Sequence, residues 1–518
     1  MTEREADYKQ TEQYSRKRRS GARRRQEGVP FNEDFKQQLL PTRLGPALFW
    51  SVLLSLLSVG NPFLTSFATN IQSQNLYAGF AMQAGQSPYG DFFGTNGVLY
   101  YLIAFVGSFL GSSIGLAILQ FVALLIAGVF FYKIVAYFSQ SQETASNFSH
   151  WFYLFILALN FGGLYASIFA LPFLLTSIWF LIRYFEKAVK DEAFILYGID
   201  AALVFLIDPK SAVLWLVAFL VLLVYNAQHR QMARGFYQLL ASLFGFLLIV
   251  YSVGYYTFVE QILGMAIQQT FFYNIRLNFG YEGILWTAGL VLGVLVVTGF
   301  LKHILMTIAS LGQKQHTYIK VVVLLGFLVQ TIFIIGNPNF DLNQLTVLFP
   351  YGFVMAVAHM KVQPSESEEL EDMEGEEPPV VSYLKTSLFL PILACLVIPI
   401  QPIYTYFLQA DVHQERSQIA QYIRENSEAT DTIYAWDDSA QVYLQSERLA
   451  AATIITAEPY LNTEENQTSV TYDLNKNQAS YIVVRNGLVM LEAVKANLEA
   501  NYSKVDLGTS QLSLYQKN

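Results

Sequence analysis

The sequence contains little charge and almost no cysteine. Charged residues make up 14% of its 518 residues, whereas soluble proteins carry about 25%. Its single cysteine, Cys395, excludes a disulfide within the chain. The six histidines form no pair at the spacing of metal ligands, so a histidine-based metal site is not expected. Neither a disulfide-stabilised fold nor a His-ligated metalloenzyme is therefore expected of this chain.

Several catalytic motifs are also missing from the sequence. It contains no P-loop, no GxSxG, no paired CxxC and no HExxH. No basic groove with interleaved aromatic residues is evident, so nucleic acid is not an expected partner. These absences exclude the commonest nucleotide-dependent and hydrolytic enzymes.

Long apolar runs are abundant instead, and 53% of the residues are hydrophobic. Several runs reach the length of about 20 residues that crosses a bilayer. We therefore predict an α-helical polytopic membrane protein with about eleven transmembrane helices. The predicted spans are residues 46–66, 113–138, 151–168, 170–185, 194–207, 212–225, 238–256, 284–301, 319–335, 345–360 and 386–407.

Lysine and arginine are distributed unevenly between the predicted loops. The Arg-rich tail at residues 1–45 is predicted to be retained and cytoplasmic. With this orientation the cytoplasmic loops hold eleven Lys and Arg residues, whereas the outer loops hold only Lys210 and Arg276. This bias predicts a multi-pass protein of the cell membrane with a cytoplasmic N-terminus.

Two further regions differ in composition from the spans. Residues 361–385 include an acidic run between prolines and are predicted to form a solvated cytoplasmic loop. Residues 408–518 follow an odd number of spans and are predicted to form a small extracytoplasmic α/β domain. Its expected helices are 414–427 and 488–500, and its expected strands are 432–436 and 480–485.

The first outer loop, residues 67–112, has an unusual composition of amides, aromatic residues and one carboxylate. Tyr77, Ala78, Ala81 and Met82 share one helical face, and Gly85 would end that helix. The stretch "SPYGD" predicts a tight turn that presents Asp91, and residues 97–112 are expected to lie as a helix on the membrane surface. A carboxylate among aromatic residues suits a general base, or a divalent cation if phosphates supply further ligands.

The other predicted outer loops contain candidates for catalysis and for binding a phosphate. Asp341 and Glu260 join Asp91 as candidate catalytic acids, and Lys210 and Arg276 are candidates for a carrier phosphate. The aromatic side chain of Tyr273 is a candidate for a prenyl or sugar groove. The alternative interpretation is ordinary loop charges in water and an interfacial aromatic belt.

Several stretches resemble one family of membrane enzymes. "LYAGFAMQAGQSPYGDFFGTNGVLYYL" at 76–102, "FLIDPKSAVL" at 205–214 and "GNPNFDLNQLTVLFPYGF" at 336–353 resemble loops of the GT-C membrane glycosyltransferases. This superfamily includes the protein O-mannosyltransferases and the aminoarabinose transferase. The resemblance covers most of residues 46–450.

The resemblance implies a reaction and a set of partners. Such enzymes transfer a sugar from a polyprenyl-phosphate carrier to a cell-envelope acceptor, which would be a wall polysaccharide, teichoic acid or protein. Asn70, Tyr77, Tyr89 and Tyr273 are then expected to bind the substrate or the carrier, beside membrane lipid. No cofactor is firmly implied, and the divalent cation named above stays an alternative.

The sequence departs from the family pattern at the expected catalytic acid. Family members have an Asp shortly before the helix with the "LY" tyrosine, where this chain has Asn70. Either Asp91 or Asp341 then supplies the acid, or transferase chemistry has been lost. The alternatives are a non-enzymatic relative that binds a lipid-linked glycan or a partner enzyme, and a lipid or polysaccharide transporter.

Overall fold

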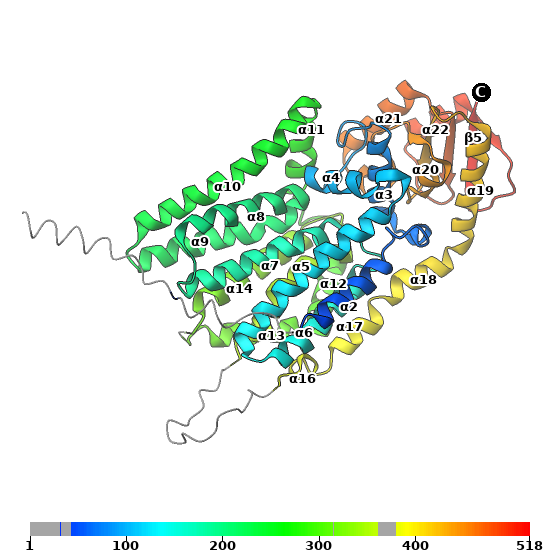
Figure 1. Cartoon of the computed structure of the whole chain (residues 1–518). Coiled ribbons are helices and arrows are strands. Elements are labelled where there is room, and N and C mark those ends of the chain that lie inside the picture. The colour runs from blue at the N-terminus through cyan, green and yellow to red at the C-terminus, as the bar shows by residue number, and fades with distance from the viewer. Residues whose placement is uncertain (1–31, 33–42, 314, 361–379) are drawn as a thin grey trace, which may run out of the picture.

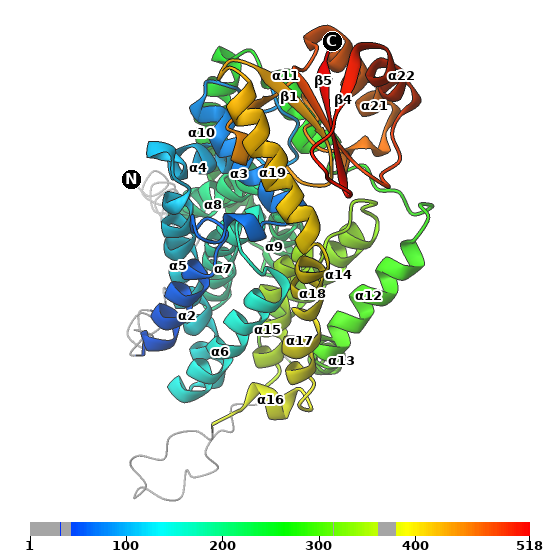
Figure 2. The ribbon, with the colours of Figure 1, turned by 90° about the vertical axis from the view of Figure 1, so that its right-hand side faces the viewer.

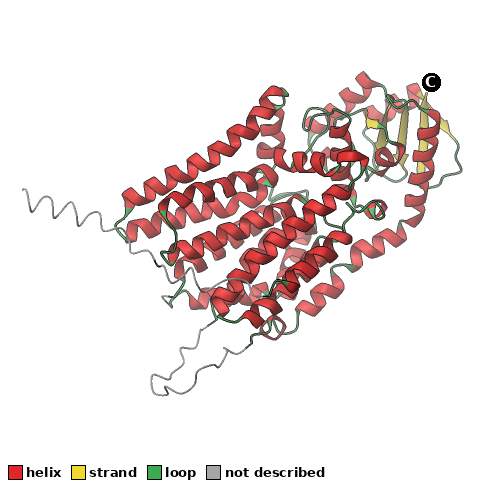
Figure 3. Cartoon of the chain, in the orientation of Figure 1, coloured by secondary structure: helices red, strands yellow, loops and turns green. Residues whose placement is uncertain are grey.

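A computed structural model describes residues 32, 43–313, 315–360 and 380–518. Helices form a bundle, and a small sheet stands at one end of it (Figures 1 and 3). Most of the predicted basic tail, residues 1–45, and most of the predicted acidic loop, 361–385, lie outside the described residues.

The bundle is built from the apolar stretches of the sequence. Its helices pack with their apolar faces against one another, and many outward-facing leucines and phenylalanines are exposed, as expected for a surface in lipid. The helices are α2 Gly45–Leu56, α5 Ile114–Ser139, α6 Gln142–Leu159, α7 Ala166–Phe185, α8 Phe194–Ile207, α9 Val213–Gln228, α10 Met232–Val259, α12 Ile284–Val297, α13 Phe300–Ser310, α14 Thr317–Ile335 and α15 Leu348–Ala358.

The number of membrane spans differs from the expected eleven. In the described part of the chain, five helices are long and apolar enough to cross a membrane. A sixth results if α12 and α13, which meet at 75°, form one broken span. The bend lies at Gly299, which has a φ of 83° outside the helical region. The multi-pass architecture is supported, and the count of eleven stays a prediction because several predicted spans form shorter helices.

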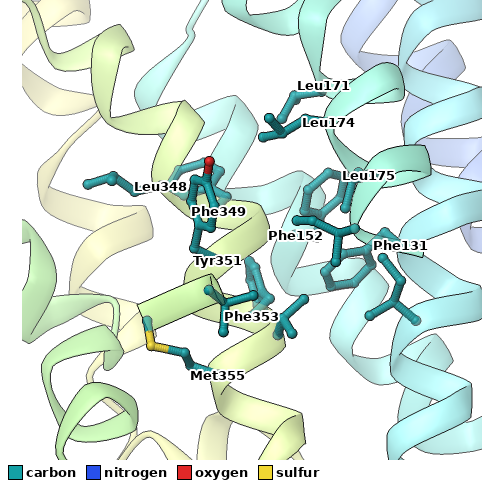
Figure 4. Packing of buried hydrophobic residues seen from close by; sticks show 14 of the residues in the cluster. Phe131, Phe152, Leu171, Leu174, Leu175, Leu348, Phe349, Tyr351, Phe353 and Met355 are labelled. Atoms are coloured by element: carbon teal, nitrogen blue, oxygen red, sulfur yellow. The ribbon is translucent and has the colours of Figure 1, made fainter. Parts of the chain in front are cut away.

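Aromatic side chains fill the centre of the bundle. Phe131 of α5 stacks on Phe152 of α6 with ring centroids 4.3 Å apart, and both contact Phe353 of α15. Figure 4 shows these three rings between the three helices. Such a core fixes the relative positions of α5, α6 and α15 and thereby the loops at their ends.

The first outer loop folds largely as its sequence predicts. Helix α3, Asn70–Gln83, begins with a capping box in which Thr69 and Gln72 satisfy each other's backbone N–H groups. It ends at Gly85, whose φ is 89°. Helix α4, Val98–Gly107, follows within the stretch 97–112, and its position on the membrane surface stays a prediction.

The chain leaves the bundle through three successive helices that run along one side toward the sheet (Figure 2). They are α17 Pro391–Val397, α18 Ile400–Leu408 and α19 Ala410–Asn426. Helix α19 contains the predicted helix 414–427 except for its last residue, and Ile419, Ala420 and Ile423 are buried on it.

The C-terminal sheet has the strand order β2-β1-β3-β5-β4. Its first three strands are parallel, and β5 and β4 complete it in antiparallel pairs. Both predicted strands and the predicted last helix are present, which confirms an α/β arrangement. The elements are β1 Thr432–Trp436, α20 Gln441–Ser446, β2 Leu449–Ala450, α21 Glu464–Asn477, β3 Tyr481–Arg485, α22 Glu492–Asn501, β4 Tyr502–Val505 and β5 Leu512–Lys517.

Candidate functional site

A polar cavity of ≈ 620 Å³ lies where the bundle meets the C-terminal domain; we call it cavity 1. The start of α7, the turn after α8 and helix α14 form its wall on the bundle side. The loop 336–344 forms a further side, and residues 457–462 of the C-terminal domain complete it. Two segments far apart in the sequence therefore close one space.

A second cavity, cavity 2, has a volume of ≈ 480 Å³ and lies toward α17 to α19. Leu290 and Ile398 give it an apolar side, and His413 and Arg416 give it a polar one. Four residues line both cavities and form the wall between them: Asn70, Tyr165, Phe340 and Asp341. Asp341 is therefore accessible from two spaces with different surroundings.

Asp341 occupies a position that suits acid–base chemistry. It precedes the short helix Leu342–Val347, and its carboxylate accepts a hydrogen bond from the Asn343 backbone N–H at 3.3 Å. Burial raises the pKa of Asp341, while this hydrogen bond and the nearby charge of Lys210 act in the opposite direction. A carboxylate with a raised pKa takes up a proton more readily than an ordinary aspartate, which suits a general base.

The turn "DPKS" after α8 contributes a buried acid and a cation. Asp208 accepts a hydrogen bond from Ser211 Oγ at 2.5 Å, and burial raises the pKa of its carboxyl group. Lys210 is close enough to Asp208 and Asp341 to interact electrostatically with both. In the described part of the chain no hydrogen bond or ion pair occupies its ammonium group, which lines cavity 1. Lys210 is thus free to bind an anion there.

A ring of hydrogen bonds joins the bundle to the C-terminal domain at the edge of cavity 1. Asn339 Nδ2 donates to the Tyr273 hydroxyl at 2.8 Å, and that hydroxyl donates to Asn462 Oδ1 at 3.1 Å. Asn462 Nδ2 then donates to Asn339 Oδ1 at 2.9 Å. Burial raises the pKa of Tyr273 to about 12, so its hydroxyl stays protonated. Tyr273 lines cavity 1, as a binding residue must.

Asn70 stands where the GT-C pattern has an acid, and it lies at the junction between the bundle and the C-terminal domain. Its Nδ2 donates to the Glu458 carbonyl at 2.9 Å, and its Oδ1 accepts from Gln74 Nε2 at 2.6 Å. The side chain therefore connects α3 to the loop that closes cavity 1. An amide can make both bonds, whereas a carboxylate could not donate to the Glu458 carbonyl.

Asp91 lies elsewhere and is bound within its own turn. Its backbone N–H donates to the Ser87 carbonyl at 3.0 Å, and its carboxylate accepts from the Ser87 N–H at 2.7 Å. The sequence predicted a poorly solvated carboxylate, but Asp91 is exposed because the turn holds it at the surface. Glu260 is also exposed and accepts from Ser87 Oγ at 3.4 Å. Both acids accept a hydrogen bond from Ser87, and neither lines cavity 1 or cavity 2.

The remaining candidates have structural contacts or lie at the rim. Tyr77 accepts a hydrogen bond from the Ala450 N–H at 2.9 Å, which fastens β2 to α3. Tyr89 is buried and donates to the Asn96 carbonyl at 2.8 Å. Arg276 is exposed and acts electrostatically on Tyr273 at the edge of cavity 1.

The aspartates that follow β1 form a buried ion-pair network. Arg416 of α19 donates to both oxygens of Asp437, at 2.6 and 2.7 Å, and to Asp438 at 2.6 Å. Asp438 also pairs with Arg485 of β3. Arg416 and Asp438 line cavity 2, but the two carboxylates already neutralise this guanidinium group. The network therefore fixes α19 against the sheet.

No group of three or more His, Cys, Asp or Glu side chains is arranged to hold a metal ion within the described residues. The divalent cation stays a prediction.

Sequence reasoning missed many polar residues that line cavity 1, among them Ser167, Asn274 and Gln330. Gln330 carried a usable signal, because it is an uncharged polar residue within the apolar stretch "VVVLLGFLVQTIFIIG". Polar side chains inside a span tend to face a cavity. Ser167 and Asn274 lie at the start of a helix and in an aromatic loop, where no local pattern distinguishes them.

The sequence matches two family models that together cover most of its length. Residues 36–410 match the N-terminal domain of the competence-induced protein Ccs4, and residues 413–518 match the Ccs4 C-terminal domain. None of the curated proteins matches the chain in sequence.

Solved structures show the same fold. ArnT from Cupriavidus metallidurans, bound to undecaprenyl phosphate, superposes with a TM-score of 0.51 at 9% identity, covering 91% of this chain and 96% of ArnT. Its apo structure gives a TM-score of 0.50 at 10% identity, with coverage of 86% and 93%. ArnT is a GT-C glycosyltransferase, so the predicted superfamily resemblance is confirmed at the level of the fold.

Proposed function

Because the chain belongs to the Ccs4 family and has the GT-C fold, we propose that it is a membrane glycosyltransferase. It would move a sugar from a polyprenyl-phosphate carrier to a wall polysaccharide, teichoic acid or protein on the outer face of the cell membrane. In this proposal the N-terminus is cytoplasmic and the C-terminal domain extracytoplasmic. The observation that carries the proposal is the placement of Asp341 on the wall between two cavities.

Cavity 1 has the chemistry to hold the donor's phosphate. Lys210 supplies an unoccupied ammonium group there. Helix α7 also begins at this cavity, and its N-cap residue Tyr165 makes no side-chain capping bond in the described part of the chain. The first N–H groups of a helix lack intrahelical partners and attract anions. Lysine and helix N-terminus together suit one phosphate group, and Arg276 at the rim would attract the carrier.

Asp341 would act as the general base. The acceptor enters cavity 2, and its hydroxyl proton passes to the Asp341 carboxylate as the hydroxyl oxygen bonds to the anomeric carbon. The bond from that carbon to the phosphate oxygen breaks, and the phosphate leaves with the carrier near Lys210. This single displacement inverts the anomeric configuration. The base lies between donor and acceptor, as the reaction requires.

The test compares two aspartates in one cell background. The gene is deleted and restored as wild type, as Asp341→Asn or as Asp91→Asn, and the sugar composition of the envelope is measured with the protein level in the membrane. We expect a sugar to be lost on deletion and restored by wild type and Asp91→Asn, but not by Asp341→Asn. Full restoration by Asp341→Asn would contradict its role as base.

A non-enzymatic function is the second candidate, because Asn70 replaces the acid of the family pattern. The protein would then bind a lipid-linked glycan through the same cavities without transferring its sugar. An unchanged envelope composition after deletion, together with retained binding of the glycan, would favour this candidate. Directional movement of a labelled lipid in vesicles would instead favour a transporter.

A further inference from the structure

Cavity 1 contains buried polar atoms that have no partner among the described residues. They are Ser167 Oγ, Asn274 Oδ1 and Gln330 Oε1. Ser167 and Gln330 are only 6% and 1% exposed. A buried polar group without a hydrogen bond costs about 1–3 kcal/mol, and each such group calls for an explanation. A ligand that supplies the missing hydrogen bonds explains all three.

The orphan atoms define what the ligand must offer. Asn274 Nδ2 donates to the carbonyls of Thr95 and Thr270, each at 2.7 Å, which fixes the orientation of its amide. Its Oδ1 therefore needs a hydrogen-bond donor. Gln330 Oε1 also has no partner among the described residues and likewise needs a hydrogen-bond donor. An ionised phosphate accepts hydrogen bonds but donates none, whereas hydroxyl groups do both.

Charges on the same wall narrow the ligand further. Lys210, Asp208 and Asp341 line this wall together, so a charged group on the ligand meets a like charge as well as an opposite one and gains little net attraction. Such a group would also lose its hydration on entering the partly buried cavity. Uncharged hydroxyl and amide groups avoid both penalties.

We propose that cavity 1 recognises an uncharged sugar ring of the hexose or N-acetylhexosamine class. Hydroxyl or amide N–H groups of the ring donate to Asn274 Oδ1 and Gln330 Oε1, and the Ser167 hydroxyl bonds to a neighbouring hydroxyl. The mixed charges of Lys210, Asp208 and Asp341 on the same wall discriminate against amino sugars and sugar acids. The assignment rests on the proposed function, in which this ring is the sugar that the carrier phosphate bears.

Binding of free monosaccharides to the purified full chain tests the assignment without any transfer reaction. Glucose, N-acetylglucosamine, glucosamine and glucuronate are titrated and followed by ligand-observed NMR. We expect the two neutral sugars to bind more tightly than the two charged ones. Gln330→Met keeps the side-chain length and removes the amide, and it should weaken neutral-sugar binding about tenfold. Gln83→Met is the control. Gln83 lies on α3, outside cavity 1, and donates to the Phe105 carbonyl of α4, so this variant should bind the neutral sugars as tightly as wild type.

Three outcomes would overturn the assignment: charged sugars that bind as tightly as neutral ones, unchanged affinity in Gln330→Met, or no binding of any sugar. Should Gln330→Met fail to fold, Ser167→Ala serves as the second variant and should also weaken neutral-sugar binding. Absence of sugar binding together with intact, Asp341-dependent transfer would contradict the sugar assignment and leave the proposed reaction standing. Sugar binding without transfer would sink the proposed reaction and leave the assignment standing.

Discussion

The first outer loop and cavity 1 are both rich in amides, aromatic groups and carboxylates, yet their polar groups differ in how they are used. In the loop, Asp91 is bound to Ser87, and Tyr77 accepts from Ala450. In cavity 1, Lys210 has no hydrogen-bond or ion-pair partner in the described part of the chain, and Gln330 Oε1 is unpaired. The polar groups of the loop therefore join bundle and sheet, whereas Lys210 and Gln330 Oε1 of cavity 1 keep hydrogen-bonding capacity that no described residue uses. The loop and the cavity are similar in amino-acid composition. They differ in whether these polar groups have hydrogen-bond partners among the described residues.

The largest expected effect contrasts the two candidate bases. Asp341→Asn should reduce transfer about 10²- to 10⁴-fold, the usual contribution of a general base, whereas Asp91→Asn should leave transfer within about twofold of wild type. A transfer assay with membranes at equal protein level measures both. A larger loss in Asp91→Asn than in Asp341→Asn would reverse the comparison.

The next effect concerns the free cation. Lys210→Met removes the charge from cavity 1 and should weaken carrier binding about tenfold, the size of one charge-assisted hydrogen bond. KM for the carrier lipid measures this, and thermal unfolding in detergent checks that the variant remains folded. The matched control is Arg276→Met, which removes an exposed cation at the rim. An equal rise in KM for both variants would show that general attraction, not Lys210, holds the phosphate.

A smaller effect should appear at the joint. Tyr77→Phe keeps the ring against Tyr443 but leaves the buried Ala450 N–H without its acceptor. We expect a loss of about 1–3 kcal/mol in the free energy of unfolding, with normal transfer by the folded fraction. Limited proteolysis should then cut between bundle and sheet.

Tyr89→Phe is the control for this experiment, since Tyr89 bonds within the loop itself. It should lower stability without exposing the junction to protease. Equal cleavage at the junction in both variants would mean that Tyr77 does not fasten the sheet.

The smallest effect is a pH dependence of stability at Asp341. Burial raises its pKa in the folded chain, so the folded state holds a proton that the unfolded state, with a pKa of about 3.9, has released. The contribution of Asp341 to the free energy of unfolding is therefore present at low pH, and it is lost as the pH rises through the raised pKa. Transfer should rise over the same interval as the base ionises. Asp341→Asn should lack this decline in unfolding temperature, and an identical decline in the variant would assign it to another group.

Local patterns predicted the local structure well. The spacing of Tyr77, Ala78, Ala81 and Met82 predicted the buried face of α3, and all four are buried. Short apolar runs with β-branched and aromatic residues predicted β1 and β3, as is typical of strands in the interior of a sheet. The span count was harder, because apolar runs do not reveal where a helix bends or ends early, as at Gly299.

The site was only partly predictable, because its members are distant in sequence. Lys210, Tyr273 and Asp341 were candidates and do line cavity 1. Asp91 was favoured for its surroundings, although the tight turn predicted around it already supplied a use for its carboxylate. Gln330 lies more than one hundred residues from Ser167 in the sequence, and only the packing of α14 beside α7 brings them to one space.

The wall between the two cavities also has an evolutionary consequence. Asn70, Tyr165, Phe340 and Asp341 each face two binding spaces at once, so a substitution there must be tolerated by both ligands together. A substitution at a residue that faces a single cavity, such as Gln330 or Ile398, must be tolerated by one ligand only. Across the family the four wall residues should therefore be substituted most slowly. The positions that face one cavity should vary more, as lineages exchange one sugar or one acceptor for another.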